Sequence, residues 1–508
     1  MTGVLTTQRD WRIQTYELRR VRRPSPYLIL GTLFWLVVAL KTWDAVPAAD
    51  FGQHAAAIER IAADWRHPSN PLLDMPGTGS PYFTPYTVLL GLLSKLTGVP
   101  GWQLLKACGP LNLALVVTGI GAFTRTLSTR RWAPVLALAA FVLLWGPEHK
   151  EWSGFLSLQS MTRGLTYPSA FAIGLTFWAW AITARTARRG VGGPWLHTGL
   201  GLLLGVILLV HPFTAMGAVI GVAALVLGLQ QTPIVAGILG RWALTAAVAF
   251  AVAGWWPYFS VSALLGDPTV DGIHRQLYGD LWQWYGLALA GLPALLYRLR
   301  LNPLDPLVLM FAGDCAVAAY GWFSGEYSYG RIFGLLLVPL QFALAVELAE
   351  APPWTLLRTV LAPLAAVAAC VGLVAQAGAI VPKRYVPPAV HLQRLNHWPS
   401  YQWAQRHVAV GDVVLTDAYG PSHVMPAYGA FLVAPTWPDP STTAAERGRR
   451  AADVRTFLAP TTAPDLRQAI ARRYHVRWIM TAPKAPVPPD TSLVATGPRT
   501  HERLYRIG

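Results

Sequence analysis

Long apolar runs alternate with short polar connections along most of this chain. The first run, residues 27–46, holds about 20 residues, enough for a helix rising about 1.5 Å per residue to cross the roughly 30 Å hydrocarbon core of a bilayer. Further runs follow at 82–98, 105–124, 132–146, 165–184, 195–211, 213–229, 234–259, 281–298, 305–322, 331–349 and 355–381. This pattern predicts a polytopic α-helical membrane protein.

The composition agrees with that class, since 53% of the residues are hydrophobic and only 13% are charged. The formal net charge of +16 would suggest a nucleic-acid partner in a soluble protein. Here the arginines gather at the ends of apolar runs, where positive charge orients helices in a membrane. We therefore expect a lipid bilayer and no nucleic acid as partner.

The arginines also decide how the chain is threaded. If every run crossed the membrane, two clusters would lie outside, against the positive-inside tendency: Arg125, Arg130 and Arg131, and Arg185, Arg188 and Arg189. The conflict disappears if the short run 82–98, which is entered through Pro81 and Pro85 and contains Lys95, lies at the interface instead. About 11 transmembrane helices then remain in a multi-pass protein of the cell membrane. We expect a basic cytoplasmic tail at 1–26, a transmembrane domain at 27–382 and an extracytoplasmic C-terminus.

This threading makes residues 44–104 one long external loop with interfacial helices. Within it, Phe51, Ala55, Ile58, Ile61, Ala62 and Trp65 recur at helical spacing, which predicts an amphipathic helix over 50–65. Asp50 stands at the start of that helix, a position where aspartate is a favourable N-cap. On spacing alone, the capping role is the better interpretation of Asp50.

After residue 380 no apolar run is long enough to span. Short strand-like segments at 412–416, 429–433, 476–479 and 492–495 alternate with helical segments at about 443–458 and 465–474. A Pro-rich linker precedes them at 381–388. We expect a small external α/β domain over 383–508.

This organisation resembles the type C superfamily of membrane glycosyltransferases, which use polyprenyl-phosphate-linked sugars. The similarity covers nearly the whole chain: an acidic loop directly after the first helix, interfacial helices before the second span, many further spans and an external C-terminal domain. The C-terminal domain adds Gly411-Asp412-Val413-Val414-Leu415-Thr416-Asp417, Met425-Pro426-Ala427-Tyr428-Gly429 and Arg467 through Tyr474-His475-Val476. The Pro-, Arg- and Ala-rich texture resembles that of actinobacterial cell-envelope enzymes.

The resemblance implies that the acidic residue just after the first helix is the catalytic base. Asp50 matches that position best and Asp44 second, with His54, one helical turn after Asp50, as an orienting partner. Such a base would take the proton of an acceptor hydroxyl, on a glycan, lipid or protein, as the sugar leaves its carrier phosphate.

The leaving phosphate calls for a cation near the outer leaflet. The external candidates for that role are Arg331, Arg275, His274 and Lys106. Arg331 ends the segment Gly325-Glu326-Tyr327-Ser328-Tyr329-Gly330-Arg331, where Tyr327 or Tyr329 could meet a sugar or prenyl chain. The alternative for Arg331 is simple snorkelling of its side chain to the membrane interface.

Two further external segments carry candidate substrate-binding residues. The loop Pro147-Glu148-His149-Lys150-Glu151-Trp152 offers ligands that a divalent metal accepts, but adjacent positions on a short loop rarely converge on one ion. We therefore expect a solvated charge cluster, with Glu148 and His149 available to substrate, and no metal cofactor. His211, before Pro212, could contact the donor sugar, although a helix terminator is the favoured interpretation.

Two other function classes stay open. A transporter or flippase of envelope lipids would show paired intramembrane charges and broken helices in two matching halves, and the sequence shows little of either. A catalytically silent scaffold for envelope assembly is the third hypothesis.

Overall fold

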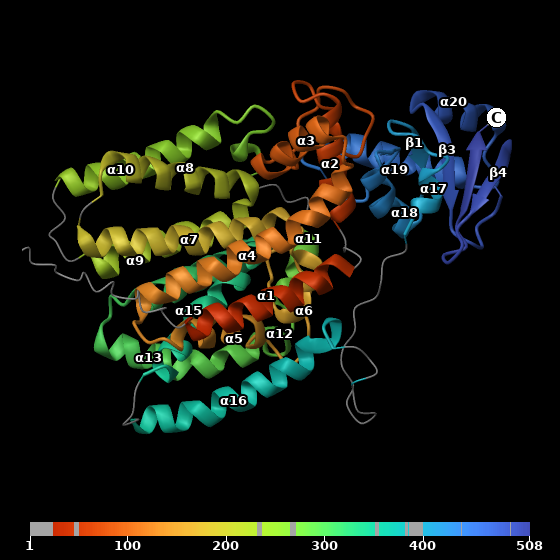
Figure 1. Cartoon of the computed structure of the whole chain (residues 1–508). Helices are drawn as coiled ribbons and strands as arrows, with labels where there is room; N and C mark the ends of the chain where they lie inside the picture. The colour runs from red at the N-terminus through yellow and green to blue at the C-terminus, as the bar shows by residue number, and fades with distance from the viewer. Residues whose placement is uncertain are drawn as a thin grey trace, which may run out of the picture.

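The helical part of the chain forms a bundle with the C-terminal domain at one end (Figure 1). The structure is a computed structural model, and it describes residues 24–44, 50–190, 192–230, 236–264, 271–350, 355–381, 385, 400–437, 439–487 and 489–507. Most of the predicted basic tail, and most of the predicted Pro-rich linker with the domain boundary near 382, therefore lie outside the described residues.

Nearly every predicted apolar run contains a helix. In chain order the bundle contains α1 (Pro26–Asp44), α4 (Gly101–Leu127), α5 (Ala133–Leu143), α6 (Leu158–Gly164), α7 (Pro168–Arg189), α8 (Pro194–Val210), α9 (Pro212–Leu229), α10 (Ala236–Gly254), α11 (Asp271–His274), α12 (Leu281–Tyr285), α13 (Leu292–Leu301), α14 (Pro306–Ser324), α15 (Phe333–Leu348) and α16 (Leu356–Gln376). Short 3₁₀ turns join several of them, including η3 (Arg275–Tyr278), η4 (Gly286–Gly291) and η5 (Tyr327–Ile332).

The predicted number of 11 spans is not confirmed. Within the described residues, seven helices are long and apolar enough to cross a membrane, or eight if the bent pair of α6 and α7 counts as one span. The run 132–146 forms only the 11-residue helix α5. The run 281–298 is broken into α12, η4 and α13, and the backbone of the broken part bonds to the preceding loop: Leu287 N–H donates to Trp145 O at 2.9 Å, and Glu148 N–H donates to Gln283 O at 2.9 Å.

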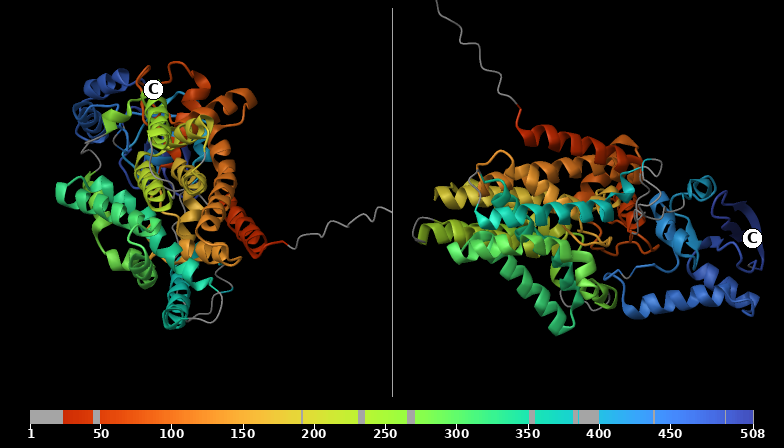
Figure 2. Two further views of the ribbon diagram at one scale, coloured as in Figure 1. Left: turned by 90° about the vertical axis from the view of Figure 1, so that its left-hand side faces the viewer. Right: turned by 90° about the horizontal axis from the view of Figure 1, so that it is seen from below.

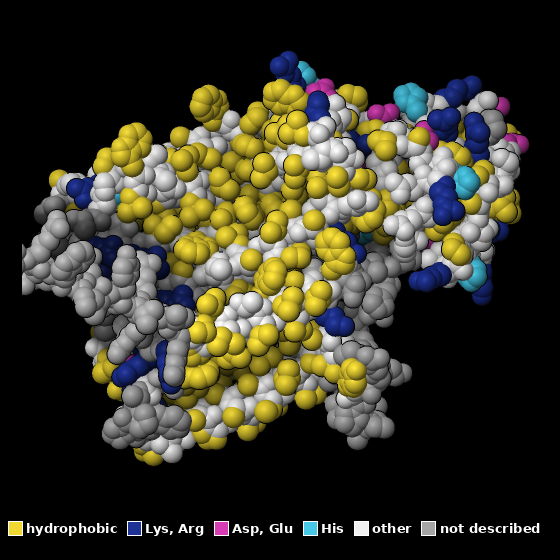
Figure 3. Space-filling model, in the orientation of Figure 1, with side chains coloured by type: hydrophobic (Ala, Val, Ile, Leu, Met, Phe, Trp, Pro, Cys, Tyr) yellow, Lys and Arg dark blue, Asp and Glu magenta, His cyan; other side chains and the backbone are white. Residues whose placement is uncertain are grey.

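Arginines gather at the end of the bundle opposite the C-terminal domain. There Arg130 forms an ion pair with Glu350 (3.0 Å), and Arg188 donates to the carbonyl of Thr126. α1 begins at this same end (Figure 2). Hydrophobic side chains cover much of the visible face between the two ends, while Lys and Arg appear mainly at the ends (Figure 3). The two arginine clusters thus share one end of the molecule, as the threading requires.

The first external loop forms two helices at the other end, α2 (Phe51–Ala63) and α3 (Pro85–Thr97). α2 buries Ala55, Ile58 and Ile61, as its amphipathic spacing predicts. α3 starts at Thr84, whose side chain accepts from Thr87 N–H, and stops at Gly98, whose φ of 71° suits glycine. Its 13 residues reach only about 20 Å, too short to span a membrane.

The C-terminal domain is built on a mixed five-stranded sheet. The strands β1 (Val413–Leu415), β2 (Phe431–Leu432), β3 (Val476–Thr481), β4 (Thr491–Thr496) and β5 (Arg503–Ile507) lie in the order β2-β1-β3-β5-β4. β1 pairs in parallel with β2 and β3, and the pairs β3–β5 and β4–β5 are antiparallel. The helices are α17 (Gln402–Gln405), α18 (Tyr419–Val424), α19 (Ala444–Leu458) and α20 (Pro464–Arg473), with η8 (Met425–Tyr428) after α18. All four predicted strands and both predicted helices are present, while β5, α17 and α18 were not predicted.

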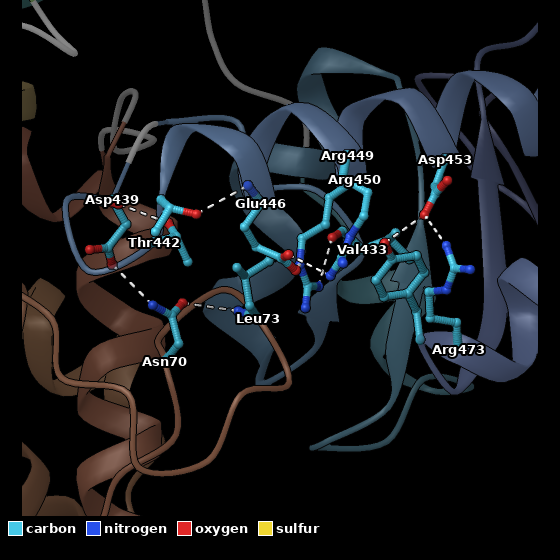
Figure 4. A network of polar contacts seen from close by, with 12 residues as sticks. Asn70, Leu73, Val433, Asp439, Thr442, Glu446, Arg449, Arg450, Asp453 and Arg473 are labelled. Atoms are coloured by element: carbon cyan, nitrogen blue, oxygen red, sulfur yellow. Dashed lines mark hydrogen bonds and ion pairs between the residues drawn. The ribbon is translucent and has the colours of Figure 1, made fainter.

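The first external loop is fastened to this domain. Arg60 of α2 donates to the carbonyls of Gly429 (2.9 Å) and Ala430 (3.0 Å), and its guanidinium lies 3.5 Å from the centre of the Phe431 ring. Leu432 N–H donates to Leu72 O at 2.7 Å, so that the loop pairs with the edge strand β2. Asn70 points at Asp439 across the interface (Figure 4), with 3.2 Å between Nδ2 and Oδ2.

We predict that Arg60→Met loosens the C-terminal domain from the bundle. The substitution leaves the buried carbonyl of Ala430 without a donor, while the carbonyl of Gly429 keeps its bond from Gly411 N–H, and it should destabilise the interface by about 1–3 kcal/mol. Limited proteolysis of the C-terminal domain and thermal unfolding measure the effect. Arg66→Met, at an exposed arginine of the same loop, is the control and should behave as wild type. Equal protease resistance of the two variants would contradict the interface.

Candidate active site

Arg331 occupies the centre of a polar cluster at the end of the bundle that carries α2. It lies in η5, between α14 and α15. Its Nη2 lies 2.8 Å from the carbonyl oxygen of Ser153 and 3.0 Å from Nε2 of His211, and its Nη1 lies 3.2 Å from Nε2 of His274. The guanidinium also lies 4.8 Å from the centre of the Phe213 ring. Three separate segments of the chain therefore meet at the Arg331 guanidinium, which is not free to snorkel.

The two histidines are held by their own local structure. His211 is the N-cap of α9, and its Nδ1 accepts from Thr214 N–H at 3.2 Å. His274, at the end of α11, is buried, and its Nδ1 lies 3.0 Å from Oγ of Ser328. Burial and the nearby Arg331 charge hold the pKa of His211 well below its usual range. The His211 imidazole is therefore neutral and adds no second positive charge beside Arg331.

The Nε–H donor of Arg331 remains unused. This buried group has no hydrogen-bond partner among the described residues. A buried unsatisfied donor is costly, and a ligand with anionic oxygens would satisfy it. Arg331 can therefore hold an anion such as a phosphate while its other nitrogens keep their protein partners.

Asp50 is the counter-charge of this cluster. It stands at the N-cap position of α2, but its side chain makes no capping hydrogen bond. Burial raises the pKa of its carboxyl from 3.8 to about 6, and attraction to Arg331 opposes that rise. The capping interpretation therefore fails, and the carboxylate is left as a base whose pKa lies close to neutrality.

His54 lies on the same face of α2, but it does not orient Asp50 as predicted. Its ring packs between Tyr82 (centroids 5.2 Å apart) and Tyr167 (5.5 Å). No hydrogen bond described in the structure joins the ring to the Asp50 carboxylate. Burial lowers the pKa of His54 to about 3, so the ring is neutral at physiological pH. His54 is thus a packing neighbour of the base, because two tyrosines occupy the space around its ring.

Tyr82 and Tyr167 are members of the cluster that sequence reasoning missed. Burial and the Asp50 charge both raise the pKa of Tyr82, so its hydroxyl stays protonated. Tyr82 follows Pro81 in the first external loop, and Tyr167 lies between α6 and α7. Their position beside external proline-containing turns was the only signal, and it does not separate a site tyrosine from an interfacial one.

Three predicted residues are near the polar cluster in sequence but lie outside it: Arg275, which follows His274, and Tyr327 and Tyr329, which precede Arg331. Arg275 is exposed and lies 5.6 Å from the centre of the Tyr327 ring. Tyr327 also packs against Tyr278 and Trp322, while Tyr329 packs against Tyr320. The tyrosines and Trp322 form an aromatic surface at the C-terminal end of α14.

The remaining predicted residues are dispersed. Glu148 is exposed. Burial lowers the pKa of His149 to about 4, and the neighbouring Gln376 at the end of α16 opposes that shift. Lys106 is half-buried in the second turn of α4, and Asp44 is the last residue of α1. Roles for Lys106 and Asp44 stay predictions.

The charged side chains of the loop from Pro147 to Trp152 do not converge on one point, as a metal site would require. Glu151 forms an ion pair with Arg163 of α6 (2.9 Å), whereas Lys150 bonds to Gln276 (2.9 Å). Over the described ranges, no group of three His, Cys, Asp or Glu side chains could hold a metal. The absence of a metal cofactor stays a prediction.

The sequence matches no protein-family model and no curated protein. Solved structures are similar. The arabinofuranosyltransferase AftD from mycobacteria superposes with a TM-score of 0.56 at 16% identity, covering 94% of this chain but only 40% of the AftD chain. ArnT from Cupriavidus metallidurans, in its apo state, superposes with a TM-score of 0.51 at 15% identity, covering 94% of this chain and 97% of ArnT.

These similarities show the fold. The chain has the type C glycosyltransferase fold of multi-pass membrane proteins, as the resemblance predicted. It spans about 40% of the length of AftD. Its own chemistry has to be argued from the polar cluster.

We predict that Arg331→Met raises the pKa of Asp50 further above about 6, because it removes the positive charge that lowers it. Difference infrared spectroscopy of the carboxyl C=O band against pH measures the shift, with Asp50→Asn as the blank. Arg275→Met removes an exposed arginine outside the cluster and should leave the titration unchanged. An unaltered titration in Arg331→Met would contradict the coupling.

Proposed function

We propose that this protein is a glycosyltransferase that moves a sugar from a polyprenyl-phosphate carrier to an acceptor hydroxyl at the outer face of the membrane. The acceptor would be a glycan, lipid or protein of the cell envelope. The observation that carries the proposal is the electrostatic coupling of one uncapped, partly buried carboxylate, Asp50, to one partly buried guanidinium, Arg331, in a single polar cluster.

Asp50 would act as the general base. Its carboxylate takes the proton of the acceptor hydroxyl as that oxygen bonds to the anomeric carbon of the donor sugar. A base with a pKa of about 6 is ionised at neutral pH and remains a stronger base than an ordinary aspartate. The proton is then held by Asp50, and the bond between the anomeric carbon and the carrier phosphate oxygen breaks.

Arg331 would receive the charge that this bond cleavage places on the phosphate. Its unused Nε–H and its position between two histidines suit a charge-assisted contact with phosphate oxygens. His211 has a lowered pKa and so stays neutral, which leaves the positive charge on the guanidinium. His274 and His211 would thereby orient Arg331 toward the donor.

The orientation of the protein follows from its arginines. The end of the bundle with Arg130 and Arg188 is opposite the polar cluster, and positive charge favours the cytoplasmic side. The polar cluster and the C-terminal domain would then lie outside, where carrier-linked sugars are used. The similarity in fold to AftD and ArnT supports the same class of reaction.

We predict that Asp50→Asn lowers the transfer rate by about 10²–10⁴-fold, since the amide cannot accept the proton. Asp64→Asn is the matched control: Asp64 is an exposed aspartate at the other end of α2, where an amide oxygen can keep the bonds from Arg66 N–H and His67 N–H. Wild-type activity should rise with pH through about 6, because the carboxyl is neutral below its pKa and ionised above it. Retained turnover of Asp50→Asn would sink the assignment of the base.

We predict that single cysteines on the two ends react from opposite sides of the membrane. In a background without Cys108, Cys315 and Cys370, Arg66→Cys and Lys484→Cys should react with an impermeant maleimide in intact cells. Thr129→Cys, beside the arginines after α4, should react only after permeabilisation. Labelling of Thr129→Cys but not of Arg66→Cys in intact cells would reverse the orientation and remove the carrier-lipid proposal.

A further inference from the structure

The C-terminal domain reaches the first turn of α2 through α18. A Cβ on Gly52 would lie 1.8 Å from the carbonyl oxygen of His423, so only glycine allows this approach. Gly52 is two residues from Asp50. A helix of the external domain is therefore held against the segment that carries the candidate base.

The position of α18 is fixed by contacts that the segment following it makes with the first loop. Arg60 holds the carbonyls of Gly429 and Ala430 directly after η8, and Leu432 pairs with Leu72. Asp439 accepts a hydrogen bond from Asn70 of the first loop at 3.2 Å (Figure 4) and another from Ser80 at 2.7 Å. These are short-range, directional bonds, so the domain sits in one register on α2.

Two rings of α18 and a third from the segment after it lie side by side. The Tyr419 and His423 centroids are 4.0 Å apart, and the edge of His423 meets Trp437 at 5.8 Å. His423 is buried, with Nδ1 lying 2.7 Å from the Tyr419 carbonyl, whereas 61% of Tyr419 is exposed. The Tyr419 ring thus packs on the buried His423 ring and is open to solvent.

Tyr419 also senses the Asp50 charge. Burial is the larger cause that raises the pKa of the Tyr419 hydroxyl, and the negative charge of the Asp50 carboxylate is the second. This agrees with the packing of α18 against Gly52. An exposed aromatic ring next to a base is suited to hold the apolar face of a sugar while one hydroxyl points to the carboxylate.

We propose that Tyr419 is a platform for the acceptor carbohydrate, contributed to the active site by the C-terminal domain. The proposal rests on the proposed function and assigns the acceptor side of the same site. The donor phosphate is assigned to Arg331, which is built from membrane helices and their turns, while Tyr419 comes from the external domain. An acceptor chain in the aqueous phase would approach from the side of that domain. The close contact at Gly52 keeps Tyr419 at a fixed position relative to Asp50.

The test compares Tyr419→Ala, Tyr419→Phe and Leu466→Ala in the full-length protein. Leu466 is an exposed apolar residue of α20 in the same domain and serves as the control. The probes are polyprenyl-phosphate-linked pentose and hexose donors, with octyl glycosides of the same sugars as acceptors. Tyr419→Ala should raise the acceptor KM about tenfold, equivalent to about 1.4 kcal/mol, with kcat and donor KM unchanged. Tyr419→Phe keeps the ring and should stay within about twofold of wild type, as should Leu466→Ala.

An unchanged acceptor KM in Tyr419→Ala, while Asp50→Asn is inactive, would overturn the platform and leave the proposed function intact. If wild type transfers no sugar between these probes, the proposed function fails for them, and saturation-transfer NMR of the octyl glycosides tests the platform separately. Loss of that signal in Tyr419→Ala but not in Tyr419→Phe would support it, and equal signals would overturn it. Protease resistance of the C-terminal domain checks that both variants are folded.

Discussion

A guanidinium partly buried at the end of a helical bundle must be satisfied by the protein around it, and Arg331 organises the site for that reason. Its bonds reach the Ser153 carbonyl, His211 and His274, which come from three different connections between helices. Asp50 supplies the opposing charge from a fourth connection. Removing water from these groups shifts the carboxyl toward neutrality and the His211 ring away from protonation, so one burial event sets several protonation states.

The second constraint is the contact between the first external loop and the C-terminal domain. α2 carries Asp50 at its start and Arg60 near its end, and Arg60 is bound to backbone carbonyls of the domain. The close approach at Gly52 joins the same two parts at the other end of α2. The base is therefore positioned by two bodies, the helical bundle and the external domain, rather than by its own loop alone.

Several elements were predictable because their signals are local. The amphipathic spacing from Phe51 to Ile61, the caps of α3 and the β-branched and aromatic residues of β3 depend only on neighbouring residues. The region 281–298 was not, since its apolar composition suits a span, yet its backbone bonds to the loop after α5 and the helix breaks. β5 was missed because its place in the sheet comes from pairing with β3 and β4 rather than from any run of its own.

The same division holds for the site. The sequence made Asp50, Arg331, His211 and His274 candidates, Asp50 through the family resemblance and the others as polar residues near the ends of apolar runs. It left a cap, a snorkelling side chain and a helix terminator open as alternatives for Asp50, Arg331 and His211. Only the tertiary structure decided that these residues meet, that Asp50 is not a cap, and that Tyr82, Tyr167 and Tyr419 lie around it. The physical reason is range: hydropathy and charge act on each segment separately, whereas desolvation and hydrogen-bond satisfaction depend on which distant segments pack together.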